Sequence, residues 1–388
     1  MSEWKTVRLG DVCEIAAGQG APQGDSNYCN DGTPFVKAGN LIELIEGKHE
    51  NQIQKVSEEV AKSHKLKKYS AGSILFAKSG MSCMKGYVYQ LKNDSYVVSH
   101  LAIVKPKEDS SNYIEYCLRH IKPNTLVKDE AYPSISLQDI SNIQIPLPPL
   151  EEQKHIANVL DKCTVLIAKY KKMLAKYDTL IKSRFIEMFG DPVQNPMGWE
   201  VKKLGDICTK ISDGVHAKPE YTATGKPFIS VVNINSGKLL FDDCKYVSEE
   251  AYEKMIKSTH PEKGDVLYTK VGATYGIPAL VDTDRAFCLY VSVALLKPKS
   301  EIVNSQFLTT SMAQPYIKNQ ADKRIKGIGV PDLHLNQIRE FEVLVPPLEL
   351  QNQFNSFVQQ IDKSKFAVQK SLEKTETLYK SLMQEYFG

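Results

Sequence analysis

Residues that could carry out catalysis do not gather into a recognisable pattern in this chain. The eight cysteines are scattered, with no Cys-x-x-Cys pair and no histidine pair beside them. Zinc sites need ligands closely paired in sequence, so we expect no structural metal and interpret the cysteines as free, mostly buried thiols. No phosphate-cradling glycine motif follows a strand, and the carboxylates form no acid–base pair. The residues therefore predict binding chemistry and no catalysis.

Two lysine–glycine turns offer the clearest binding chemistry. Apolar strands are expected at 74–77 and 266–269, and each is followed by a lysine, Lys78 or Lys270, and then by a glycine. Because glycine lets the backbone approach a ligand closely, such a turn can hold a cation beside an anionic group. The loops that follow, 81–86 and 273–276, differ strongly in content, although the strands before them match.

The densest basic loop contains Lys318, Lys323, Arg324 and Lys326 near two glycines. A basic run is often only a solvated face, and contact with phosphate is the alternative. The formal net charge of +3 permits nucleic-acid binding but does not demand it, so a binding surface would have to come from such local clusters.

These loops belong to an internal repeat. Residues 148–190 align without a gap with residues 346–388, at a constant offset of 198, and both segments begin with Pro-Pro-Leu-Glu and end with Phe-Gly. Matching segments also open each half, with a tryptophan at Trp4 or Trp199 that we expect to anchor the core. At 388 residues the chain exceeds the usual size of one core, so two domains are expected.

The repeated segment is predicted to be one long helix. Pro149 is tolerated in a first helical turn, Gly190 suits a left-handed C-cap, and no Gly or Pro lies between them. Apolar residues alternate at spacings of three and four, which is typical of a coiled-coil seam. The expected seam consists of Ile156, Val159, Cys163, Leu166, Tyr170, Met173, Tyr177 and Leu180, and in the second copy of Phe354, Phe357, Ile361, Val368, Leu372, Leu378 and Leu382.

A rod of about 60 Å cannot bury its stripe against one small domain, so its natural partner is the other copy. We therefore predict an α+β protein with an internal pseudo-two-fold repeat, in which two similar globular domains are joined by two long helices in an antiparallel coiled coil. Short amphipathic helices are expected at 58–70 and 249–263, and longer ones at about 111–121 and 304–319. The predicted boundaries are 1–147 for the first domain, 148–190 for its helix, 191–345 for the second domain and 346–388 for the last helix.

The duplicated set of motifs resembles the specificity (S) subunit of type I restriction–modification enzymes. The resemblance is carried by Pro148-Leu150-Glu151-Gln153, by Phe189-Gly190-Asp191-Pro192, and by Trp199 with Leu204-Gly205-Asp206. It covers the whole chain and implies a non-catalytic DNA reader with two target-recognition domains, each reading one half of a bipartite site. The helices would fix the gap between the halves.

The resemblance also implies partners. Two methyltransferase (M) subunits would dock around this chain and methylate adenine at N6 with S-adenosylmethionine, a cofactor expected on those subunits and not on this chain. Motor-nuclease (R) subunits would complete the restriction complex on double-stranded DNA. No apolar run long enough to span a bilayer is visible and no signal peptide opens the sequence, so a cytoplasmic location is expected.

Loop position and residue type, without motif transfer, give the candidate DNA contacts, because base edges specify sequence and phosphates position the protein. The candidates for base edges are Gln19, Gln23, Asn40, His216, Asn233 and Asn235. The candidates for phosphate or guanine are Lys37, Lys78, Lys85, Lys218, Lys270, Lys323, Arg324 and Lys326, and the loop residues Thr274 and Tyr275 complete the set.

Two other functions are considered. A DNA methyltransferase with its own recognition domain should contain an Asp/Asn-Pro-Pro-Tyr/Phe motif, but the Pro-Pro pairs here are followed by leucine. A stand-alone DNA-binding regulator or adaptor without a methyltransferase partner is compatible with the sequence, although the weak net charge disfavours it.

Overall fold

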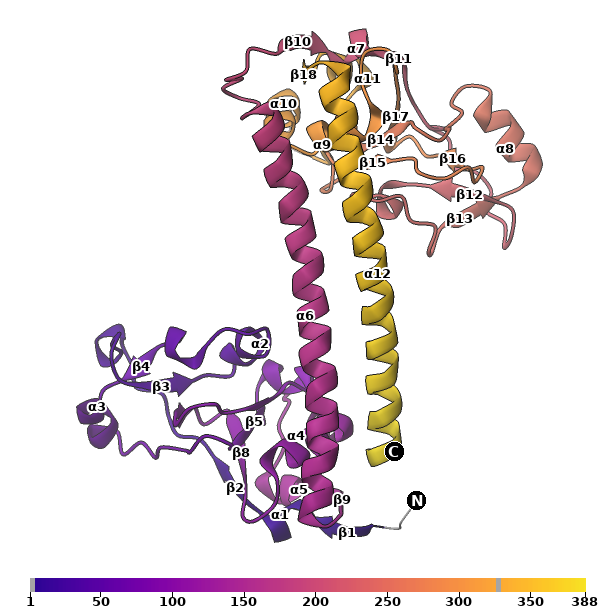
Figure 1. Ribbon diagram of the computed structural model, residues 1–388. Helices are drawn as coiled ribbons and strands as arrows, with labels where there is room; N and C mark the ends of the chain where they lie inside the picture. The colour runs from indigo at the N-terminus through magenta and orange to yellow at the C-terminus, as the bar shows by residue number, and fades with distance from the viewer. Residues whose placement is uncertain (1–3, 326–328) are drawn as a thin grey trace. The chain divides into compact units, whose positions relative to one another are not determined.

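The computed structural model describes residues 4–325 and 329–388 and contains two compact units (Figure 1). The first unit holds the chain up to Lys171 together with Lys370–Gly388, and the second holds Lys172–Gln369. Each unit therefore consists of one globular domain and a part of both long helices.

The globular domain of the first unit mixes short strands with short helices. Its strands are β1 (Lys5–Arg8), β2 (Cys13–Ala17), β3 (Thr33–Val36), β4 (Lys55–Val56), β5 (Ile74–Ala77), β6 (Val88–Gln90), β7 (Tyr96–Val97), β8 (Leu101–Pro106) and β9 (Gln144–Leu147). Its α-helices are α1 (Leu9–Val12), α2 (Asn40–Ile45), α3 (Glu58–Ser63), α4 (Ser111–Ile121) and α5 (Leu137–Ser141). The 3-10 turns are η1 (Asp25–Asn27), η2 (Glu50–Gln52), η3 (Met81–Lys85) and η4 (Pro123–Leu126).

The globular domain of the second unit follows the same plan. Its strands are β10 (Glu200–Lys203), β11 (Cys208–Asp213), β12 (Lys226–Ile229), β13 (Lys245–Val247), β14 (Val266–Thr269), β15 (Pro278–Leu280), β16 (Cys288–Leu289), β17 (Val293–Pro298) and β18 (Glu342–Val345). Its helices are α7 (Leu204–Ile207), η5 (Val231–Asn233), α8 (Glu249–Ile256), α9 (Ser305–Met312), α10 (Pro315–Arg324) and α11 (Leu335–Arg339).

The strand order shows that both domains share one topology. A four-stranded antiparallel sheet has the order β2-β8-β5-β6 in the first domain and β11-β17-β14-β15 in the second. A three-stranded sheet follows, β4-β3-β7 or β13-β12-β16, with one parallel pair in each. The first and last strands of each domain close it as a pair, β1 with β9 and β10 with β18. The predicted repeat is confirmed at the level of topology.

The long helices are α6 (Leu150–Phe189) and α12 (Leu348–Phe387), of 40 residues each. Gly190 follows α6 with a φ of 80°, as expected of a left-handed cap, and its N–H donates to Ile186 O at 2.8 Å. The Trp199 indole N–H donates to Phe189 O at 2.9 Å and satisfies another terminal carbonyl of the helix. Trp199 is only part-buried, so its clearest role is this hydrogen bond at the helix end and not the core anchor that was predicted.

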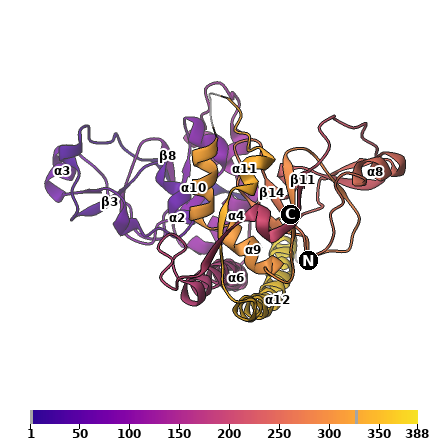
Figure 2. The ribbon, with the colours of Figure 1, turned by 90° about the horizontal axis from the view of Figure 1, so that it is seen from above.

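Both units show the two helices side by side and antiparallel (Figures 1 and 2). In the first unit, the core that contains Ile156 and Leu160 near the start of α6 also contains Met383 near the end of α12. In the second unit, the relation is reversed, and Phe354 near the start of α12 packs with Phe185 and Phe189 near the end of α6. The ring centroids of these three phenylalanines lie 5.1–5.6 Å apart.

A buried glutamine ties the start of each long helix to its own domain. Gln153 Nε2 donates to Asp109 Oδ1 at 2.8 Å and Pro148 O at 3.0 Å, and its Oε1 accepts from Ser110 N at 3.0 Å. Gln351 repeats the arrangement with Ile302 O, Pro346 O and Asn304 N at 2.7–3.1 Å. Because both side chains are at most 1% exposed, these bonds are made away from water and direct the helix as it leaves the domain.

The predicted seam is wrong at every second position in the middle of α6. Leu166, Met173 and Leu180 are 40–45% exposed, whereas the residues that follow each of them, Ile167, Leu174 and Ile181, are half-buried. Each predicted residue has an apolar neighbour on its C-terminal side, so a 3.5-residue period can pass through either member of the pair. Packing selects the second member. In α12 the same correction replaces Leu378 with Tyr379, which packs on the first core.

Three predicted helices also differ from the structure. The segments 58–70 and 249–263 form shorter helices, α3 and α8, that end at Ser63 and Ile256. The segment 304–319 is divided into α9 and α10 because Pro315 can begin a helix but cannot continue one. The prediction for the cysteines is confirmed, since all eight are free and seven of them are buried.

The corrected seam makes a testable distinction between two leucines of α6. We expect Leu160→Ala to lower the free energy of unfolding by about 3 kcal/mol, because Leu160 is fully buried and its removal leaves a cavity. Leu166→Ala should cost less than about 1 kcal/mol, because that side chain is already in water. Urea unfolding followed by circular dichroism measures both. If Leu166→Ala lowered the free energy of unfolding as much as Leu160→Ala, the seam would pass through Leu166.

Candidate nucleic-acid interface

The Gly-rich loops leave their sheets at positions where only glycine fits. A Cβ on Gly18 would lie 2.2 Å from the carbonyl oxygens of Val97 and Val98, and a Cβ on Gly214 would lie 2.0 Å from Leu289 O. Both distances are far below van der Waals contact, so the backbone itself packs against the neighbouring strand end. The loops that follow are held at the same place in both domains.

The two glutamines of the first Gly-rich loop differ in availability. Gln19 Nε2 donates to Lys65 O at 2.6 Å, and its Oε1 accepts from the Lys67 N–H. Both ends of this carboxamide are therefore engaged inside the domain. Gln23 is exposed and donates to Ala21 O at 2.9 Å.

Two of the predicted asparagines close turns. Asn40 Oδ1 accepts from Lys37 N at 2.9 Å, and Asn233 Oδ1 accepts from Ser230 N at 3.0 Å. Because equivalent residues make the same bond in both domains, the bond belongs to the shared frame. Asn235 lies beyond the second turn and is exposed, so its carboxamide faces solvent.

The lysines of the two lysine–glycine turns are held by the same backbone bonds but have different side-chain environments. Lys270 is 4% exposed, and its Nζ lies 3.4 Å from both Asp213 Oδ2 and Asp332 Oδ1. Alanine and serine stand where these acids would be in the first domain, at Ala17 and Ser134. Lys78 is half-buried and has no ion pair among the described residues. Only Lys78 therefore presents a free charge.

A hydrogen-bonded cluster orders the loop after β14. Tyr275 Oη donates to Asp322 Oδ1 at 2.5 Å, and Lys318 forms an ion pair with the same carboxylate and lies over the Tyr275 ring. The hydrogen bonds from Lys318 and Tyr275 lower the pKa of Asp322 from its ordinary value. Thr274, beside Tyr275, is exposed, and its carbonyl oxygen accepts from Thr269 Oγ1 at 2.7 Å.

The basic cluster of the second domain is only partly free. Arg324 donates to Gln320 O at 2.9 Å and to Glu340 O at 3.1 Å, and stacks over Phe341. Lys323 is exposed. The predicted contact Lys326 lies outside the described residues.

The other predicted cations lie on the surfaces of their own domains. Lys85 is exposed at the end of η3, and Lys37 Nζ donates to Gln54 Oε1 at 2.6 Å while lying over the Tyr28 ring. In the second domain, Lys218 is exposed and its Nζ lies 5.7 Å from the centroid of Tyr221. His216 is also exposed, 3.5 Å from Asp213 Oδ1.

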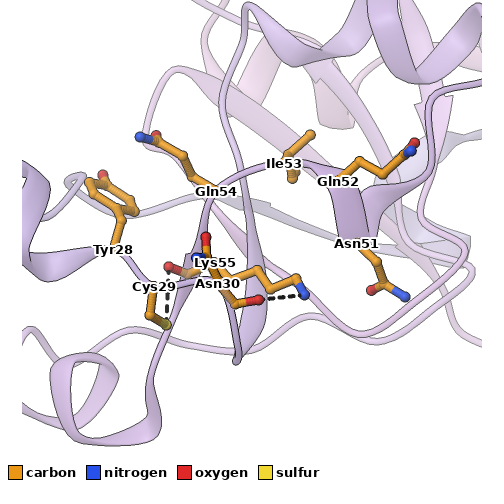
Figure 3. Close-up of a pocket in the computed structure, with 8 residues that line it drawn as sticks. All are labelled: Tyr28, Cys29, Asn30, Asn51, Gln52, Ile53, Gln54 and Lys55. Atoms are coloured by element: carbon orange, nitrogen blue, oxygen red, sulfur yellow. Dashed lines mark hydrogen bonds between the residues drawn. The ribbon is translucent and has the colours of Figure 1, made fainter.

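A polar hollow of about 420 Å³ in the first domain contains side chains that the sequence analysis missed (Figure 3). It is lined by Tyr28, Cys29, Asn30, Asn51, Gln52, Ile53, Gln54 and Lys55. Carboxamides are the side chains that pair with the major-groove edge of adenine, so this surface is chemically suited to base contact. The run Asn-Gln-Ile-Gln at 51–54 was the available signal.

Exposed loop tips and a basic run were also missed. Tyr132 and Val330 occupy equivalent positions, and are 82% and 73% exposed. Each precedes a proline whose carbonyl oxygen accepts from Gly80 N or Gly272 N at 2.9 Å.

The basic run at 62–68 was predicted to be part of a helix, but α3 ends at Ser63, so three of the four lysines in this run lie in a loop.

No cluster that could hold a metal ion occurs among the described residues. Burial raises the pKa of the Cys13 and Cys208 thiols to about 12, so neither is a thiolate at neutral pH. In the part of the chain that the structure describes, no helix is long and apolar enough to cross a membrane.

The fold and its loops define a protein with two similar domains that carry different polar loops on one frame. Residues 1–175 and 196–376 match the family described as "Type I restriction modification DNA specificity domain". The chain belongs to this family, whose members are generally non-catalytic.

Individual proteins agree with this assignment. The chain is 24% identical over 418 residues to the type I restriction enzyme MjaVIII specificity subunit of Methanocaldococcus jannaschii, covering 98% of this chain and 91% of the relative. The EcoBI specificity subunit of Escherichia coli is 25% identical over 62% of this chain and 55% of its own length. Among solved structures, the type I restriction–modification S subunit from M. genitalium has a TM-score of 0.65 at 14% identity, covering 99% of this chain and 96% of that one.

The two equivalent lysines should respond differently to the same substitution. Lys270→Met leaves the largely buried Asp213 without its cation, and we expect it to lower the free energy of unfolding by about 3 kcal/mol. Lys78→Met should change the free energy of unfolding by less than about 0.5 kcal/mol. It should also reduce the slope of log Kd against log salt by the amount expected for the loss of about one phosphate contact. Thermal unfolding and DNA titrations at several salt concentrations measure the two effects. Equal behaviour of the two variants would contradict the structural role of Lys270.

Proposed function

We propose that this chain is the DNA-reading subunit of a type I restriction–modification complex, in which each domain reads one half of a bipartite target. The observation that carries the proposal is the duplication itself, since two domains have one strand order and different loops. A shared frame places the loops in the same way, whereas different side chains contact different bases. The family membership supports the same function.

The long helices are proposed to set the distance between the half-sites. Each is a continuous helix of 40 residues with no interior proline or glycine. Within each unit the two helices pack on each other and carry an ion pair, Lys171–Glu376 at 3.1 Å in the first and Lys365–Asp178 at 2.5 Å in the second. A helix of this length rises about 60 Å, so the number of residues between the domains would translate into a number of base pairs.

Partner subunits are proposed to cover part of the helices. Leu166, Met173 and Leu180 recur every seven residues along α6 and are 40–45% exposed. Apolar side chains in water at regular helical spacing are suited to contact with helices of another protein. A solved chain described under "Structural basis underlying complex assembly and conformational transition of the type I R-M system" has a TM-score of 0.54 at 18% identity, covering 100% of this chain and 98% of that one, which is compatible with assembly.

The partners are proposed to be two methyltransferase subunits, which would use S-adenosylmethionine to methylate adenine at N6, and restriction subunits that join afterwards, all in the cytoplasm. The alternative of a stand-alone DNA-binding regulator has no specific observation in its favour. Purification with the methyltransferase subunits separates the two, because a regulator would form no stable complex with them.

Exchange of one domain tests the modular arrangement. We expect replacement of residues 1–147 by the corresponding domain of a relative to change one half of the methylated sequence and to leave the other half intact. The positions of methylated adenines in host DNA provide the measurement, and recovery of the complex with methyltransferase subunits is the control for assembly. A change in both halves would contradict one domain reading one half-site.

Shortening the helices tests their role as a spacer. Removal of one heptad from each helix, residues 167–173 and 365–371, preserves the 3.5-residue period and should reduce the gap between the methylated half-sites. The bases of each half-site should stay the same, because the domains are untouched. The methylated positions are mapped as before, and an unchanged gap in an assembled, active complex would exclude the spacer role.

A further inference from the structure

A lysine-rich segment of the first domain has no role in the function described so far. Residues 58–70 contain four lysines and two glutamates, whereas the equivalent residues 249–263 of the second domain contain three lysines and four glutamates. All four lysines, at positions 62, 65, 67 and 68, are exposed. None of them forms an ion pair with any residue that the structure describes.

The segment is held in a defined shape although it lies at the surface. Two residues after the end of α3, Lys65 lies in the left-handed region at a φ of 51°, and Leu66 N donates back to Ala61 O at 2.8 Å. A lysine in this conformation costs roughly 1–2 kcal/mol, so other contacts must hold it there. Gln19 supplies two of them, because its carboxamide bonds to the backbone of Lys65 and Lys67.

The other end of the segment is anchored in the core. Tyr69 is buried, exchanges two backbone hydrogen bonds of 2.9 Å with Ser95, and donates from its hydroxyl to Ala17 O at 3.1 Å. The Nζ atoms of Lys67 and Lys68 lie 5.5 and 5.8 Å from the ring centroids of Tyr69 and Tyr96. The backbone that carries the lysines is thus positioned before any ligand arrives.

A further cation lies close to these lysines. Lys105 of β8 lines a small hollow of about 50 Å³ together with Lys67 and Lys68. Glu14 lines the same hollow and is the carboxylate among its lining residues. Three lysines against one glutamate leave this surface positive, and a phosphate group matches that charge.

The equivalent segment of the second domain has largely lost its free charge. Lys254 Nζ lies 2.8 Å from Glu250 Oε1, and Lys263 Nζ lies 3.0 Å from Asp284 Oδ2. Lys297 is the residue of the second domain that is equivalent to Lys105. Its Nζ lies 2.8 Å from Asp265 Oδ2 and also forms an ion pair with Glu262. A basic surface that is free in one domain and neutralised in the other is not required by the shared fold, so it is available for a ligand specific to the first domain.

We propose that residues 62–68 form a phosphate-binding loop through which the first domain binds the DNA backbone, and that Gln19 positions this loop. The inference rests on the proposed DNA-reading function and assigns to it a contact that is unequal between the halves. Phosphate contacts fix the register of a protein on DNA without selecting bases. In this arrangement Gln19 acts through the loop and reads no base.

The test compares two double substitutions in the complete complex with its methyltransferase subunits. Lys67→Gln with Lys68→Gln should reduce the slope of log Kd against log salt by about 2, since each phosphate contact contributes about 0.9. The matched control, Lys254→Gln with Lys263→Gln, removes the same charge from the second domain and should change the slope by less than about 0.5. Fluorescence anisotropy between 50 and 200 mM NaCl, on duplexes with and without the target, gives the slopes.

A third variant tests the role of Gln19. Gln19→Leu should reduce the salt slope and speed hydrogen exchange at the Lys67 amide, while the methylated sequence stays the same. A changed first half-site would instead mean that Gln19 reads a base and would overturn its positioning role.

The outcomes separate this inference from the proposed function. An unchanged slope for Lys67→Gln with Lys68→Gln, in a complex that still binds its target, would overturn the phosphate-binding loop and leave the DNA-reading function intact. Failure of the unmodified complex to bind any duplex would overturn the proposed function itself.

Discussion

The largest hydrophobic core of each unit is completed by the last turns of the helix that begins in the other half of the chain. Phe185 and Phe189 of α6 pack with Phe307 and Phe354 in the second unit, and the end of α12 packs on Tyr113 and Tyr116 in the first. Aromatic pairs with centroids 4.8–6.5 Å apart add to the stability that burial provides. The largest core of each unit contains side chains of both helices, so the helical pairing is the constraint from which the repeat architecture follows.

This constraint explains where the chain is the same in both halves and where it differs. The helix starts must be directed correctly, and Gln153 and Gln351 share two bonds for this task, one to a Pro-Pro carbonyl oxygen and one from a backbone N–H. Gly18 and Gly214 are equally restricted, because their backbones touch the neighbouring strand ends. The loops beyond these points are not restricted in this way, so their side chains can differ between the domains, as the proposed reading of two different half-sites requires.

The balance of charge differs in the same way. Lys270 is buried between two aspartates, whereas Lys78 occupies the equivalent turn without an acidic partner among the described residues. The lysines of residues 62–68 are exposed, whereas two of the three lysines in residues 249–263 are ion-paired. Identical frames thus support different electrostatic surfaces, because exposed charges cost the fold little and are free to serve a ligand.

The repeat, the two long helices with the glycines at their C-terminal ends, the α+β class and the family resemblance all follow from the order of residues. These features depend on local signals, namely proline and glycine at helix ends, apolar periodicity and a constant offset, which do not require knowledge of distant contacts. The tertiary structure alone decided which member of each apolar pair enters the seam, since Leu166 and Ile167 are equivalent until a partner helix packs on one of them. It also decided which polar loop residues are available. Gln19 and Lys270 look like free contact residues in the sequence, but each is engaged by groups that the fold brings close, 46 residues away for Gln19 and 57 and 62 for Lys270. The physical reason is that a hydrogen bond or ion pair depends on distance in space, which the order of residues does not specify.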